Sequence, residues 1–215
     1  MLLDFIRSTL GDAERVFHFR RSFAGQLAIS SMLQHAFCVA ERTPSRIVFN
    51  ERTGQVFAPD FRFSYNNQGF LDEQRVPFRL TRNLRELIGS IFEAGRFVPA
   101  MATFATAVKN HLEDIDPVLK LLMRDDIIAW YTSKSMAKSD AKTQELEKQL
   151  HDRVLKNVSQ VQIRMVECSF RRPPKDLTPE KLPKDPVDKK VRSLVEEATN
   201  REKLCQMLPN YQPWL

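Results

Sequence analysis

The sequence has little glycine and cysteine and no long apolar run. Only 6 of the 215 residues are glycine, which excludes collagen-like and glycine-rich chains. No stretch approaches the roughly 18 consecutive apolar residues of a membrane-spanning helix, so no membrane span is expected. The three cysteines, Cys38, Cys168 and Cys205, are odd in number and far apart. They favour reduced thiols of the cytosol or nucleus over a disulfide framework.

The sequence also lacks a strong excess of charge of one sign. Its 33 lysines and arginines oppose 27 aspartates and glutamates, which gives a formal net charge of +6. The surplus is diffuse, because the densest basic runs, Arg171-Arg172 and Lys189-Lys190, lie beside acidic residues. We therefore expect a solvated basic surface and no direct nucleic-acid contact. A basic helical nucleic-acid-binding module stays as an alternative, testable by salt-dependent binding.

The usual catalytic and metal-binding patterns are absent. His18, His35, His111 and His151 stand apart from one another and from cysteine, so no zinc site is expected. Neither the G-x-x-x-x-G-K-[ST] phosphate loop nor the dinucleotide-binding G-x-G-x-x-G occurs.

What the sequence does contain is mostly helical periodicity. Apolar residues recur near a 3.6-residue repeat within residues 2–40, with a break at Gly11-Asp12. Two short β-favouring runs, 47–49 and 55–57, predict a hairpin with Thr53-Gly54 at its turn. Residues 63–78 have the composition of a loop.

Amphipathic helices follow this loop, and we expect their apolar residues to form the core. Pro117 is placed as a helix-start residue, and residues 171–185 are rich in proline and charge, typical of a stiff exposed linker. The apolar residues of the expected faces are Leu84, Leu87, Ile88, Ile91 and Phe92; Phe97, Met101, Phe104, Ala105 and Val108; Val118, Leu121, Leu122, Ile127 and Trp130; Leu146, Leu150, Val154, Val158, Val161 and Met165; and Val187, Val191, Leu194, Val195 and Ala198.

Several short motifs follow one another in an order that is typical of a known protein family. Residues 41–46 read E-R-T-P-S-R; the hairpin follows, then D-F-R at 60–62 and P-F-R-L-T-R-N at 77–83. This order resembles the catalytic-loop and metal-loop region of the phosphatidylinositol-3-kinase-related protein kinases, with D-R-H-x-x-N, a hairpin, D-F-G and P-F-R-L-T-x-N. Residues 125–130 resemble the family's D-P-L-x-x-W, and the last 30 residues resemble its closing FATC segment.

The resemblance implies a mainly α fold: the C-terminal lobe of a PI3/PI4-kinase-like fold, with a small β hairpin and a C-terminal FATC helix. Residues 1–132 would form this lobe, without the N-terminal lobe that carries the glycine-rich loop and the phosphate-pairing lysine. Residues 133–170 would be a variable linker and an amphipathic helix, residues 171–185 a proline-rich linker, and residues 186–215 the FATC segment.

The departures from the family pattern fall on the catalytic chemistry. The base is Glu41 instead of aspartate, the histidine is Thr43, and the second metal-binding asparagine is Arg46. At about 4 Å and an effective dielectric near 20, a guanidinium and Mg²⁺ repel by about 8 kcal/mol. The glycine of D-F-G is Arg62. We therefore predict a pseudokinase with no catalytic residue, metal or cofactor; the degenerate positions are Glu41, Arg42, Thr43, Arg46, Asp60, Phe61 and Arg62.

These residues have structural roles to fill. We expect Asp60-Phe61 to be a remnant of the fold, with the phenylalanine packed inward. Arg46 either pairs with Glu41 or Asp60 or is simply exposed.

The pattern of loss, the run R-D-D-I-I-A-W at 124–130 and the ending Trp214-Leu215 resemble the transformation/transcription domain-associated protein subfamily. This implies a nuclear, non-catalytic scaffold of a SAGA-type histone acetyltransferase complex, acting in transcription regulation and chromatin modification. Its partners would be other coactivator subunits and transcription activators, with no small-molecule substrate. It also implies the C-terminal end of a larger protein or a truncated relative. The alternative is a fragment of an active kinase of this family. Tyr211, Trp214 and Leu215 are candidate interaction residues, either docked on the lobe or presented to a partner.

Overall fold

The computed structural model describes residues 2–40, 42–58, 61–134, 143–170, 189–207 and 211–212. The fold is mainly α-helical with one small hairpin, as predicted, and the predicted linker 171–185 lies outside the described residues. The elements are α1 (Leu2–Leu10), α2 (Ala13–Ala36), the 3-10 turn η1 (Pro44–Arg46), β1 (Val48–Phe49), β2 (Val56–Phe57), α3 (Arg82–Phe92), the π-helical turn η2 (Glu93–Phe97), α4 (Val98–Asn110), α5 (Leu112–Lys134), α6 (Thr143–Cys168), α7 (Lys189–Thr199) and α8 (Arg201–Cys205).

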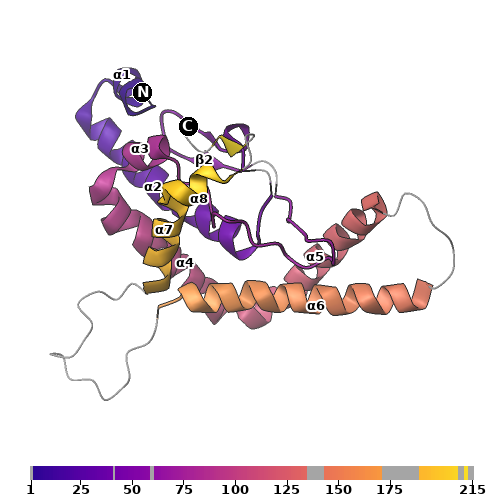
Figure 1. Cartoon of the computed structure of the whole chain (residues 1–215). Helices are drawn as coiled ribbons and strands as arrows, with labels where there is room; N and C mark the ends of the chain where they lie inside the picture. The colour runs from indigo at the N-terminus through magenta and orange to yellow at the C-terminus, as the bar shows by residue number, and fades with distance from the viewer. Residues whose placement is uncertain are drawn as a thin grey trace, which may run out of the picture.

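Helix α2 is the centre of the fold and packs against α1, α3, α4, α6 and the hairpin (Figure 1). Its N-terminus is capped by Asp12, whose carboxylate accepts a hydrogen bond from the Glu14 amide. Its residues Phe19, Phe23 and Leu27 are fully buried in the core. The long helix α6 crosses one end of the bundle and runs beside α5, while α7 packs on α4 and α6.

The hairpin is fastened to α2. Its two strands pair antiparallel, with Val48 opposite Phe57 and Phe49 opposite Val56. The Phe49 ring lies edge-on to Phe23 at 5.4 Å, and the Gln26 side chain of α2 accepts a hydrogen bond from the Val56 amide at 2.8 Å. The hairpin therefore has a fixed place on the helix that leads into residues 37–47.

A tight approach of backbone to backbone occurs at the hairpin turn. Gly54 has a φ of +71°, and a Cβ atom added there would lie 2.5 Å from the backbone oxygen of Phe19. Both the left-handed conformation and the missing side chain are thus needed at this position.

Helix α3 is kinked near its C-terminal end, before the chain passes through η2 into α4. Gly89 has a φ of +73° inside α3, and Arg20 of α2 donates hydrogen bonds to the carbonyls of Leu87 and Ile88 at 2.8 and 2.7 Å. The guanidinium therefore supplies the donors that the interrupted helix lacks.

The placement of Pro117 as a helix start was wrong. Helix α5 begins at Leu112, and Pro117 lies inside it. Proline removes one amide donor, which would have bonded the carbonyl of Glu113 four residues earlier. Because Glu113 is exposed, water can satisfy that carbonyl and the helix continues through the proline.

The prediction of the core was also wrong in part, because several apolar residues expected to be buried are exposed. In α5 the buried residues are Leu119, Met123 and Ile127, whereas Val118 and Leu121 are 64% and 61% exposed. Leu122 is exposed as well, and so is Ile91 of α3. The periodicity located the helices correctly but could not separate the inner face of α5 from a second apolar stripe on its outer side.

The predictions for α6, the loop and the cysteines agree with the structure. Val154, Val158 and Val161 of α6 are buried in the core together with Met165. Within the described residues all three cysteines are free, Cys38 and Cys168 buried and Cys205 exposed. Each helix in the described part of the chain is too short or too polar to serve as a membrane span.

Substituting Gly54 by alanine is expected to lower the free energy of unfolding by about 3 kcal/mol, because alanine is strained at positive φ and its methyl group meets the Phe19 carbonyl. The measurement is urea unfolding followed by circular dichroism. The matched control is Gly95→Ala in η2, where nothing lies within 4 Å of the added carbon; it is expected to stabilise the chain by about 0.5 kcal/mol. Equal effects of the two substitutions would contradict this account of the turn.

Candidate functional site

Two segments that the sequence places far apart meet at the end of α2. The Ala40 amide donates to the carbonyl of Arg62 at 2.8 Å, and the Ser64 amide donates to the carbonyl of Cys38 at 2.9 Å. These bonds flank an antiparallel bridge between Val39 and Phe63. The segment after α2 and the segment after the hairpin, which carry the predicted site residues, are therefore joined through their backbones.

Arg42 points into the protein. Its side chain is only 6% exposed, and its three guanidinium nitrogens donate to the carbonyls of Val39, Val76 and Gln34 at 2.9, 2.5 and 3.2 Å. Burial lowers the pKa of this guanidinium from its ordinary value. Arg42 thus ties the segment after α2 to the end of the 63–78 loop.

Thr43 and Arg46 lie on the surface turn that follows. The turn η1 is closed by the Arg46 amide, which donates to the Thr43 carbonyl at 3.0 Å, and the hydroxyls of Thr43 and Ser45 lie 2.9 Å apart. Arg46 is half-buried and lines a small cavity of about 40 Å³ together with Ala58 and Phe61.

Phe61 and Arg62 lie on the facing segment. The Phe61 ring is 39% exposed and contacts the rings of Phe37 and Phe63 at centroid distances of 5.2 and 5.5 Å. The expectation that Phe61 packs inward was therefore wrong: Phe61 stays partly open to solvent at the edge of the aromatic cluster, and Phe63 takes the buried position. The Arg62 side chain is exposed, and the backbone carbonyl of Arg62 accepts the hydrogen bond from the Ala40 amide.

The remaining predicted site residues, Glu41, Asp60, Trp214 and Leu215, lie outside the described residues. Within residues 40, 42–47, 58 and 61–64, the ionisable side chains are three arginines, Arg42, Arg46 and Arg62. What this described part offers chemically is positive charge and the hydroxyl groups of Thr43, Ser45 and Ser64.

Arg79 is the functional residue of this region that sequence reasoning missed. It is 2% exposed, and its guanidinium donates to the carbonyl of Arg42 at 2.9 Å, to that of Gln212 at 2.9 Å, and to that of Tyr211. Its backbone amide donates to the Gln34 side chain at 3.0 Å. The signal was present in the motif P-F-R-L-T-R-N at residues 77–83, which indicates the family but does not show which groups the Arg79 side chain contacts.

Tyr211 docks on the lobe. Its ring lies under the Arg79 guanidinium at 4.8 Å, and its hydroxyl donates to the Phe78 carbonyl at 3.4 Å. Burial raises the pKa of this phenol to about 12, although Arg42 and Arg79 act in the opposite direction. The terminal segment is therefore held by the same arginine that holds the segment after α2.

Helix α6 holds the 63–78 loop from the other side. Asn157 is fully buried; its side chain accepts from the Leu71 amide at 3.0 Å and donates to the Gly69 carbonyl at 3.0 Å. Arg164 donates to Glu73 at 2.9 Å and to the Ala36 carbonyl at 3.0 Å. Nothing in the apolar periodicity of this helix marked Asn157 as a residue that binds a loop.

His35 lies half-buried beside this network. Burial lowers its pKa to about 4, with smaller contributions in the same direction from Arg164, Lys190 and Arg42, while Glu73 opposes them. Among the described residues, its Nε2 atom has no hydrogen-bond partner. The imidazole is therefore neutral near pH 7, and protonating it in the folded chain is unfavourable.

The chain is similar in sequence to known proteins. Residues 1–132 match the model of the family described as phosphatidylinositol 3- and 4-kinase. The whole chain is 29% identical to the mouse transformation/transcription domain-associated protein, of which it covers 8%. It also resembles the SAGA complex/NuA4 acetyltransferase complex subunit TRA1 of Saccharomyces cerevisiae, 27% identical across 62% of this chain and 4% of that one.

A kinase relative and a solved structure are similar as well. The serine/threonine-protein kinase ATR of Arabidopsis thaliana is 24% identical across 96% of this chain and 7% of its own length. The FAT and kinase domain of CtTel1 superposes on the whole chain with a TM-score of 0.64 at 18% identity, over 14% of that protein. The chain thus spans less than a tenth of the length of these curated relatives.

Replacing Arg79 by methionine is expected to lower the free energy of unfolding by about 3 kcal/mol, because three buried carbonyls lose their donor. Hydrogen exchange of the residues after Cys205 should accelerate in parallel. The control is Arg82→Met, an exposed arginine three residues on, which should change stability by less than about 0.5 kcal/mol. Unchanged protection of the terminal segment in the Arg79 variant would contradict the assignment.

Stability is expected to fall with pH between about 6.5 and about 4 through His35. In this window the unfolded chain binds a proton at this histidine and the folded chain does not, so acid favours unfolding, by up to about 3 kcal/mol. Urea unfolding at pH 4.5 and 7.5 measures the loss, which should shrink in His35→Gln but persist in His18→Gln, because His18 is exposed. Equal acid sensitivity of the parent chain and His35→Gln would refute this prediction.

Proposed function

Because the chain belongs to the phosphatidylinositol 3- and 4-kinase family, we propose that it is a non-catalytic member, a pseudokinase lobe that acts as a scaffold. Its place would be a SAGA-type histone acetyltransferase coactivator complex in the nucleus, among other subunits and transcription activators. The resemblance of the whole chain to the mouse transformation/transcription domain-associated protein and to the yeast SAGA/NuA4 subunit supports this context.

The observation that carries the loss of catalysis is the position of Arg46. In the family pattern this position holds a metal-binding asparagine, and phosphoryl transfer depends on metal ions that neutralise the phosphates. Here a half-buried arginine lines the small cavity between the two site segments. A guanidinium in place of the asparagine removes a metal ligand and brings positive charge to the point where a kinase would hold Mg²⁺.

A scaffold role is supported by what holds the region together. Arg42 and Arg79 donate hydrogen bonds to backbone carbonyls of three segments of the lobe. The described part of the lobe therefore keeps its architecture through interactions that do not involve catalytic groups. This is the property that a partner-binding surface needs when the chemistry has been lost.

An active kinase is the second candidate, favoured by the similarity to the Arabidopsis ATR kinase over nearly the whole chain. Asp60 matches the metal-loop aspartate of the family pattern, and Glu41 retains a carboxylate. This candidate requires Arg46 to turn away from the metal. The two candidates differ in whether Mg²⁺–ATP is turned over.

The test is phosphotransfer by the purified chain and by a fusion that places the N-terminal lobe of the Arabidopsis relative ahead of residue 1. We expect no turnover above background. The same fusion carrying the family residues (Glu41→Asp, Thr43→His, Arg46→Asn and Arg62→Gly) controls for a competent assembly and should gain at least tenfold. Turnover by the unaltered fusion that Asp60→Ala abolishes would overturn the proposal.

A further inference from the structure

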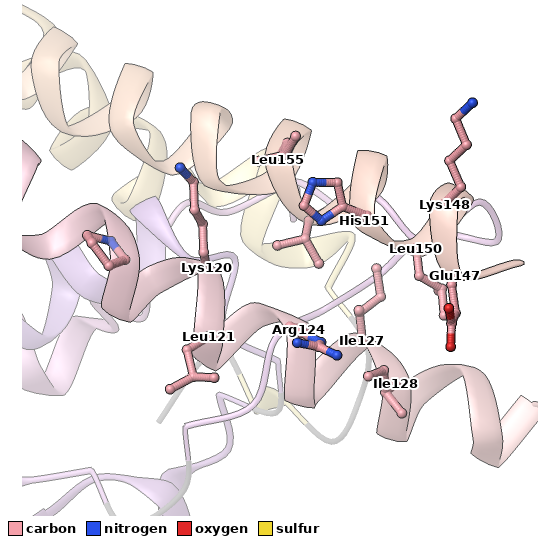
Figure 2. A pocket seen from close by; sticks show the side chains of 12 residues that line it. Lys120, Leu121, Arg124, Ile127, Ile128, Glu147, Lys148, Leu150, His151 and Leu155 are labelled. Atoms are coloured by element: carbon pink, nitrogen blue, oxygen red, sulfur yellow. The ribbon is translucent and has the colours of Figure 1, made fainter. Parts of the chain in front are cut away.

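A groove runs between α5 and α6 and is lined by residues of these two helices. Its volume is about 790 Å³, within the range of ligand- and peptide-binding clefts. Figure 2 shows its two walls: Lys120 points from α5 towards α6, and His151 points from α6 towards α5. Ile127 and Val154, both buried, contribute to its floor.

The walls of the groove carry two aligned stripes. On α5, Leu121, Arg124 and Ile128 are spaced by three and four residues, so they share one face of the helix. On α6, Lys148, His151 and Leu155 have the same spacing. Each stripe therefore presents apolar and basic groups together along the length of the groove.

The apolar members of these stripes are open to solvent. Leu121 is 61% exposed, and Ile128 and Leu155 are 42% and 39% exposed. Large aliphatic side chains gathered beside a cleft of this size are typical of an interaction surface. Two helices packed side by side leave a groove into which a third amphipathic helix fits, with apolar anchors every three to four residues.

The charges beside the groove select the partner. Lys120, Arg124 and Lys148 line it, and among the described lining residues Glu147 is the one acid. Lys120 is already paired with Asp116 at 2.5 Å, so Arg124 and Lys148, with the His151 imidazole, define the charge offered to a ligand. A second copy of this chain would bring the same cations against each other, which disfavours self-association through this face.

We propose that the α5–α6 groove binds an acidic amphipathic helix of a partner protein. The leucine-type anchors of that helix would lie on Leu121, Ile128 and Leu155, and its flanking carboxylates would face Arg124 and Lys148. This inference goes beyond the proposed scaffold role and does not depend on the loss of catalysis, because a kinase lobe with the same groove would bind the same helix.

The experiment is selection from a displayed library of 18-residue helices on the full 215-residue chain. Every helix carries leucine along one stripe, and each flanking position is glutamate or lysine in all combinations. We expect enrichment of glutamate at the flanks. The selected helix, labelled and measured by fluorescence anisotropy, should bind at least tenfold more weakly to the double variant Arg124→Glu/Lys148→Glu and to Leu121→Asp.

Matched controls separate the groove from a general charge effect. Lys109→Glu changes one exposed lysine on α4, outside the groove, and should leave binding of the selected helix unchanged. A helix with lysine flanks should bind the Arg124→Glu/Lys148→Glu variant better than the parent chain. Enrichment of lysine flanks, no enrichment at all, or equal binding to the parent and the double variant would each overturn the proposal. The proposal would also be overturned if the parent chain sedimented as a dimer and the Leu121→Asp substitution converted it to a monomer.

Discussion

Two buried guanidiniums bind the parts of this lobe into one unit. The Arg42 side chain donates hydrogen bonds to carbonyls of α2, of the segment after α2 and of the 63–78 loop. The Arg79 side chain donates to the backbone carbonyl of Arg42 and to those of Tyr211 and Gln212. A buried cation is stabilised only when its donors are fully matched, so the arrangement tolerates little displacement of any of these segments. Every residue has a backbone carbonyl, so these hydrogen bonds fix the course of the backbone and depend little on which side chains the bonded residues carry.

The residues that hold the fold are therefore different from the residues at the catalytic and metal-binding positions. The residues that differ from the kinase pattern and that the structure describes, Thr43, Arg46 and Arg62, lie at the surface or partly buried, whereas Arg42 and Arg79, which match the pattern, are buried. A family member can therefore replace metal-binding and proton-transferring groups while the surrounding loops keep their course. The family pattern thus mixes two kinds of residue: those that react and those that hold the frame.

The sequence allowed the helices, the hairpin and the family to be predicted, because each depends on local periodicity or on motifs in a fixed order. It failed where tertiary packing decides. Two apolar stripes of α5 look alike in sequence, yet Leu119 and Met123 face the core while Val118 and Leu121 face solvent. Asn157 stands within an apolar repeat, and only the fold shows that it faces the backbone of Gly69 and Leu71. Arg79 could be recognised as part of a motif, but its hydrogen bonds join residues more than 130 positions apart.

The buried Asn157 gives helix α6 a mechanical role. Its amide takes the place of a neighbouring strand, offering one acceptor and one donor to the 63–78 loop, and Arg164 fastens the same loop two turns further on. The N-terminal half of α6 forms one wall of the groove with α5 (Figure 2), and the residues that hold the loop, Asn157 and Arg164, follow in the second half of the same helix. A displacement of α6 against α5 would therefore move the attachment points of the 63–78 loop as well, because both lie on the same helix.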